Sequence, residues 1–142
     1  MATANAATTF LENRLLGHIF KNTTFTSPGD SIYVGLATAV SDAETGSLTE
    51  ASFSGYARVQ VAAASWTTIG ADSTDTQTAK NTSAIEFPAK TDSGNVTITH
   101  VIIADASSSG NILFVGALDA SKTLAQNDIF RINATNLSIE LK

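Results

Sequence analysis

After Pro28 the chain is a series of short apolar segments, separated by stretches rich in Gly, Ser, Asn and Asp. Several segments alternate apolar and polar residues, which is the pattern of a strand with one buried face. The alternation is clearest near the C-terminus, where Leu137, Ile139 and Leu141 share one face while Ser138 and Glu140 share the other. Seven segments read as strands in this way: residues 31–38, 56–64, 83–87, 95–105, 111–118, 128–133 and 136–141.

Seven short strands joined by turns predict a mainly β fold, either an antiparallel β-sandwich or a small barrel. Residues 95–105 and 111–118 form a predicted hairpin through Ser107–Gly110, and residues 128–133 and 136–141 form a second one. Residues 41–55 and 70–81 are predicted to be exposed polar loops. The second half of 95–105 is apolar on both faces, so we expect a central strand that is covered on both sides, with an N-terminal helix as one candidate cover.

One amphipathic α-helix is predicted over residues 9–20. Leu11, Leu15 and Ile19 recur at a spacing of four residues and make one apolar stripe. Thr9 and Glu12 fit a capping box at its start, and Pro28 follows a run of β-branched threonines that ends it.

The chain divides into an N-terminal arm and helix (residues 1–28) and a single β domain (residues 29–142). A helix of this length is marginal alone, so we expect it to pack on the domain or on a neighbouring subunit, with the Ala-rich lead before it flexible. We expect the apolar stripe and three aromatic side chains to form these contacts. The candidate interface residues are Phe10, Leu11, Leu15, Ile19, Tyr33, Tyr56 and Trp66.

The composition excludes several classes of partner. Charged residues make up only 15% of the chain, the net charge is −5, and no basic stripe is present, so a nucleic-acid partner is not expected. No apolar run approaches the ~20 residues of a membrane-spanning helix, and no signal peptide is visible. The absence of cysteine excludes disulfides and thiolate metal sites. The 35 Ser and Thr residues instead supply neutral hydrogen-bonding groups for interfaces.

No constellation of catalytic or metal-binding residues is found, so the chain is predicted to be a non-enzyme without metal or cofactor. The two histidines, His18 and His100, are far apart in the sequence and are expected on the helix surface and bonded to a hydroxyl inside a strand, respectively. Tyr33, Tyr56 and Trp66 leave two interpretations open, a sugar-stacking platform or packing. Packing is favoured, because Tyr56 and Trp66 flank apolar strand residues.

The chain resembles a widespread family of short tailed-phage proteins that are commonly labelled tail fibre or virion structural proteins. Six segments carry the resemblance: FLENRLLGHIFKNTTFTSP (10–28), IYVGLAT (32–38), GYARVQV (55–61), KNTSAIEFP (80–88), VTITHVIIADASSSGNILFVGAL (96–118) and KTLAQNDIFRINATNLSIEL (122–141). The resemblance implies a β fold and a place in the phage particle, made in the bacterial cytoplasm, but it implies no ligand site.

Three functions fit these features. The first is an outer capsid decoration or cement protein that binds the major capsid protein. The second is a tail-fibre or tail-associated protein that contributes to host-receptor binding, and the third is a free-standing lectin-like module. The chain contains no heptads or repeats that would build a fibre shaft, which favours decoration. Expected partners are other virion proteins and further copies of the chain, with a trimer favoured.

Overall fold

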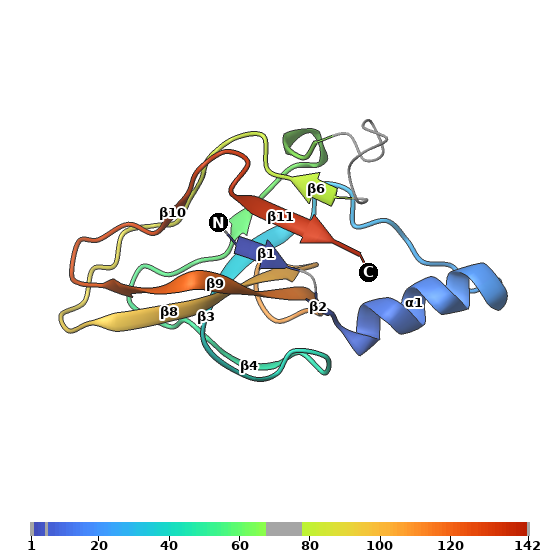
Figure 1. Cartoon of the computed structure of the whole chain (residues 1–142), viewed down its shortest axis with the longest axis horizontal. Coiled ribbons are helices and arrows are strands. Elements are labelled where there is room, and N and C mark those ends of the chain that lie inside the picture. Colours follow the sequence, from blue (N-terminus) through green and yellow to red (C-terminus); the bar gives the residue numbers. More distant parts are fainter. Residues whose placement is uncertain (1, 5, 68–77, 142) are drawn as a thin grey trace.

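The computed structural model describes residues 2–4, 6–67 and 78–141, and these residues form a mainly β structure with one α-helix (Figure 1). A nine-stranded sheet runs in the order β4-β3-β8-β9-β1-β11-β6, with β2 paired to β9 and β5 to β3. Its strands are β1 (Ala2–Ala4), β2 (Ala6–Ala7), β3 (Tyr33–Asp42), β4 (Ser47–Glu50), β5 (Val59–Gln60), β6 (Thr78–Lys80), β8 (Val96–Ala104), β9 (Ile112–Leu124) and β11 (Leu137–Glu140). The other elements are α1 (Thr9–Phe20), the 3₁₀ turn η1 (Ala63–Ser65) and a two-stranded sheet of β7 (Ile85–Glu86) and β10 (Arg131–Ile132). This curled, largely antiparallel architecture confirms the predicted fold class and the helix.

The central strand is β8, which pairs antiparallel with β3 on one side and β9 on the other. The β8–β9 hairpin and the burial of both faces of β8 agree with the prediction. The cover differs from the expected helix. Ile102 packs in a small cluster with Val115, Val40 and Leu48, so the β3–β4 hairpin covers this face. Ala43 and Leu48 pack on this face of the sheet, so α1 does not cover it.

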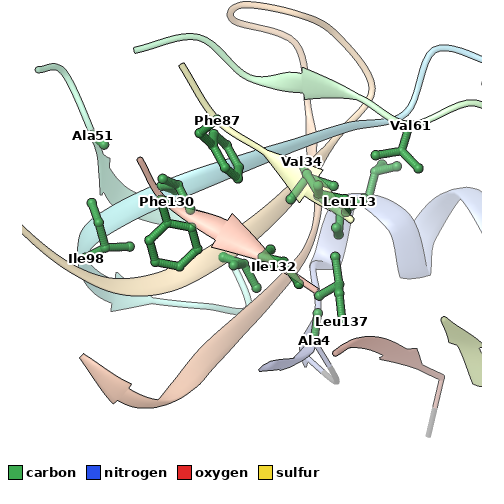
Figure 2. Packing of buried hydrophobic residues seen from close by; sticks show 14 of the residues in the cluster. Ala4, Val34, Ala51, Val61, Phe87, Ile98, Leu113, Phe130, Ile132 and Leu137 are labelled. Atoms are coloured by element: carbon green, nitrogen blue, oxygen red, sulfur yellow. The ribbon is translucent and has the colours of Figure 1, made fainter. Parts of the chain in front are cut away.

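The main core joins side chains from both sheets (Figure 2). Phe87 and Phe130 come from the segments of β7 and β10 and contact each other edge to face at 5.8 Å. They belong to the same buried cluster as Leu36 and Ile98 of the large sheet. Each such side chain contributes roughly 1.5–3 kcal/mol through burial, so this cluster fixes how the two sheets lie.

Two sequence-based predictions about the β elements are wrong. The C-terminal hairpin does not form, because β10 pairs with β7 while β11 pairs with β1 and β6. Residues 41–55 are not simply an exposed loop, because they contain β4 and bury Ala51 and Phe53. For the loop at 70–81, residues 70–77 lie outside the described part of the chain and 78–80 form β6.

The Ala-rich N-terminal lead is not a free tail. β1 lies in the sheet between β11 and β9, parallel to the first and antiparallel to the second. Ala4 is fully buried there. β2 then continues along β9 through Ala6 and Ala7. Ala4 belongs to the main core cluster, so β1 contributes to the core.

Candidate interaction surface

The N-terminal end of α1 is fastened to β9 through Thr8. The Thr8 hydroxyl donates to the carbonyl of Ile112 at 2.6 Å, and its amide donates to the carbonyl of Leu113 at 2.9 Å. Its hydroxyl oxygen also accepts weakly from the amide of Leu11, at 3.5 Å. The N-cap is therefore Thr8 and not Thr9, and the predicted capping box is wrong by one residue. The cap was hard to find because Thr8 and Thr9 are chemically equivalent in the sequence.

The apolar stripe of α1 passes from buried to exposed along the helix. Leu11 is 6% exposed, Leu15 is half-buried and Ile19 is 66% exposed. Phe10 packs at the edge of the core beneath the guanidinium of Arg14, which lies 5.2 Å from the ring centroid. The structure thus anchors the first turn of the stripe on the domain and leaves its end uncovered.

The far end of α1 carries three exposed apolar side chains, Leu16, Ile19 and Phe20, here called the helix tip. Leu16 and Phe20 are 55% and 74% exposed. Their spacing of three and four residues places them on neighbouring turns of one helix side. Figure 1 shows α1 projecting away from the sheet, with the helix tip at its distal end.

A family model described as Podophage GP4 fiber I protein gp80 matches residues 6–140 of the chain. The match spans nearly the whole sequence, from β2 to β11. The chain belongs to the podophage fibre I family. This confirms a structural protein of the phage virion and the resemblance to phage proteins labelled tail fibre. No match was found among curated proteins.

In this podophage fibre I protein the three predicted aromatic residues do not form an exposed platform. Tyr56 stacks on Phe87 at 6.4 Å and meets Phe53 edge to face at 5.3 Å, so it is part of the core. Tyr33 and Trp66 are both half-buried, the first at the start of β3 and the second in an isolated bridge with Asn81. Packing accounts for the observed position of Tyr56.

Tyr56 also contacts a partly buried ion pair between Glu50 and Arg58. Its hydroxyl accepts from the amide of Leu36 at 2.9 Å and donates to Glu50 at 2.8 Å. Glu50 receives two further bonds from Arg58, at 2.7 and 2.8 Å, while Arg58 donates to the carbonyls of Ala106 and Ser109. Burial alone would raise the pKa of Glu50, but the hydrogen bonds from Arg58 and Tyr56 outweigh it and lower that pKa. The charges are fully engaged in holding loops together.

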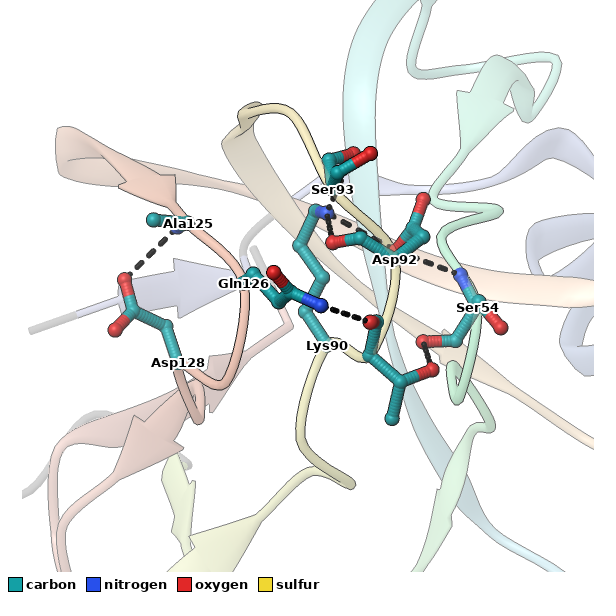
Figure 3. A network of polar contacts seen from close by, with 8 residues as sticks. Ser54, Lys90, Asp92, Ser93, Ala125, Gln126 and Asp128 are labelled. Carbon is teal, nitrogen blue, oxygen red and sulfur yellow. Dashed lines mark hydrogen bonds and ion pairs between the residues drawn. The ribbon is translucent and has the colours of Figure 1, made fainter.

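A second polar network surrounds Lys90, which is 2% exposed (Figure 3). Its ammonium group donates to the carbonyl of Asp92 at 2.6 Å, to the carboxylate of Asp92 at 3.0 Å and to the carbonyl of Ser93 at 3.4 Å. The same carboxylate accepts from the amide of Ser54 at 3.1 Å. Every donor has a local partner, so the lysine clamps two loops.

The two histidines of this fibre I protein lie on different elements, and each bonds to a residue nearby in the sequence. His18 is exposed and its Nδ1 lies 3.2 Å from the carbonyl of Thr23. His100 is half-buried, and its Nδ1 lies 2.7 Å from the hydroxyl of Thr99. Burial lowers the pKa of His100. Within the described residues, no three His, Asp or Glu side chains gather to hold a metal ion, and no helix is long and apolar enough to cross a membrane.

A hollow of about 490 Å³ lies beside β9 and β10. Its wall is mixed, with exposed Ile129 beside Arg131 and Lys122. Arg131 also lies 3.6 Å from Glu86 across the β7–β10 pair. The hollow is open, and we assign no chemistry to it.

Proposed function

We propose that this protein is a component of a podophage tail fibre, and that it attaches to a neighbouring virion protein through the helix tip. The fibre description of the family supports the tail over the outer capsid surface that the sequence alone favoured. The missing shaft repeats do not count against this role, because a small β protein serves as an attachment or junction piece of a fibre.

The observation that carries this proposal is the exposure of Leu16, Ile19 and Phe20 at the end of a projecting helix. Burying a side chain of this size contributes roughly 1.5–3 kcal/mol, so leaving three in water is costly unless a partner covers them. The other exposed large apolar side chains among the described residues, Ile129 and Leu141, come from two separate segments of the chain, whereas the helix tip gathers three on one helix. The helix tip therefore stands out as the surface suited to docking.

A matched pair of variants on the same stripe tests the proposal. Ile19→Asp changes the exposed end and should leave the melting temperature unchanged while abolishing incorporation into particles. Leu11→Asp changes the buried end and should lower the melting temperature, because it places a charge inside the core. Normal incorporation of folded Ile19→Asp protein would contradict docking through the helix tip.

The location in the particle is tested separately by counting copies in purified virions by quantitative mass spectrometry. We expect the number to match the tail fibres of the particle. A number that matches the capsid lattice would support the decoration role instead.

A further inference from the structure

The N-terminal strand β1 occupies a slot between two other strands of the sheet. In this slot β1 pairs with β11 on one side and with β9 on the other. The side chain of Ala4 is fully buried there. This strand precedes every other described element in the chain.

The connection between this segment and the rest of the domain is long. After α1 the chain turns at Asn22, whose φ is 52°, and residues 21–32 return to β3 without a helix or strand (Figure 1). The turn is closed only by local bonds, in which the amides of Lys21 and Thr23 donate to the carbonyl of Gly17. Phe25 and Ile32 pack against the core, and Asp30 accepts hydrogen bonds from Gln60 and Ala63, so opening the connection would release these contacts.

Opening that turn would give the N-terminal segment a long reach. The 12 residues of α1 span ~18 Å as a helix. The twelve residues from 21 to 32 span up to ~40 Å when extended. A segment tethered in this way reaches the equivalent slot of an adjacent copy.

We propose that β1, β2 and α1 form an exchangeable arm, and that this arm of one copy occupies the slot between β9 and β11 of another. The occupant is a second copy of this chain, because the slot already fits this sequence within one molecule. The same pairings and the same Thr8 and Leu11 contacts form in either arrangement, so exchange loses none of them. Repeated around a rotation axis, such head-to-tail exchange closes into a ring.

This inference is independent of the proposed docking through the helix tip. Exchange uses the strands and the first turn of α1, whereas docking uses its far end. Exchange would also bring the helix tip of one copy next to another copy, but it does not require that contact.

Single-cysteine variants give a direct test, because the natural chain has no cysteine. Ala6 and Val115 are cross-strand partners between β2 and β9. Such partners have Cα atoms ~4.5–5.5 Å apart, within the range of a disulfide. A chain with Ala6→Cys and a second, size-tagged chain with Val115→Cys are produced in the same cells, purified without reductant and analysed by non-reducing gel electrophoresis. If the arm exchanges, a disulfide should link the two different chains into a heterodimer. This heterodimer should disappear on reduction and should not form when either cysteine is absent.

The control pair is Thr97→Cys with Thr123→Cys. These residues face each other across the β8–β9 hairpin, and both are exposed. This hairpin is local and has no connection that could exchange, so its mixed single variants report chance cross-linking. The arm pair should exceed this background several-fold.

A second arm pair, Ala2→Cys with Leu118→Cys, repeats the test at the β1–β9 contact should the first pair fold poorly. Heterodimer at the control level for both arm pairs, together with an intrachain bridge in a double variant of one chain, would overturn the exchange. Helix-tip variants that still enter particles would instead refute the docking role and leave the exchange standing.

Discussion

Replacing Asn81 should be among the most damaging single changes in this protein, although Asn81 lies far from any candidate interface. Its side chain is fully buried at the end of β6. The amide group donates to the carbonyls of Ser83 and Asn133 at 2.7 and 2.9 Å, and its oxygen accepts from the amide of Leu137 at 2.9 Å. One side chain thus joins its own segment to residues 133–137, which lie more than 50 positions away in the sequence.

Asn81→Ala removes all three bonds. Each backbone group left without a partner in a buried site costs about 1–3 kcal/mol, and entering water recovers part of that cost. We expect a loss of about 3–5 kcal/mol in the free energy of unfolding. For 142 residues the unfolding entropy is ~0.3 kcal/mol/K, so the melting temperature should fall by about 10–17 °C. Chemical denaturation with calorimetry measures both quantities.

Asn81→Asp serves as the isosteric comparison. Its carboxylate still accepts from Leu137 but faces two carbonyl oxygens, which raises its pKa above the ordinary ~3.9. The variant should therefore lie closest to wild type below about pH 4, where the acid is protonated, and lose stability relative to wild type as the pH rises toward neutrality. A loss below about 1 kcal/mol for Asn81→Ala, or no pH dependence for Asn81→Asp, would refute this account.

Two further changes test the packing and the ion pair. Gly35→Ala should cost about 1–3 kcal/mol in denaturant unfolding, because a Cβ there would lie 2.9 Å from Cγ1 of Ile102. Glu50→Gln should cost about 1–2 kcal/mol at pH 7, because Arg58 loses its charged partner. Since the pKa of Glu50 is lowered from 4.5, its contribution is complete above pH 4.5 and is lost as the pH falls through the folded value, so the variant and wild type should converge in acid. A constant difference between them at all pH values would contradict the assigned ion pair.

The elements that depend on local pattern were predictable. The run of apolar residues in 95–105, with Ser and Gly after it, specifies a central strand and its hairpin. The spacing of Leu11, Leu15 and Ile19 specifies the helix. Gly35 lies inside β3, where an added Cβ would meet Ile102 and Tyr56, so the close packing favours glycine at this position.

Strand partners were not predictable, because alternation assigns faces and not neighbours. β10 and β11 are separated by only four residues, yet they belong to different sheets. The separation depends on Asn81, whose side chain reaches both Asn133 and Leu137, and nothing in the local sequence marks this asparagine as buried. β1 was not predicted either, because Ala-rich segments have low strand propensity. It forms a strand through its pairing with β9 and β11.

For the interaction surface too, the local sequence predicted the helix and its apolar stripe, but not which part of the stripe is buried. An apolar stripe has the same sequence whether a helix is buried along its whole length or only at one end. Thr8 determines which end of the helix is buried, because its bonds to Ile112 and Leu113 fix the start of α1 on β9. From that fixed point the helix leaves the domain, so Leu11 becomes an anchor while Ile19 becomes accessible. Under the proposed docking, the buried end of the stripe serves folding and its exposed end serves attachment, and variants at the two ends distinguish these roles.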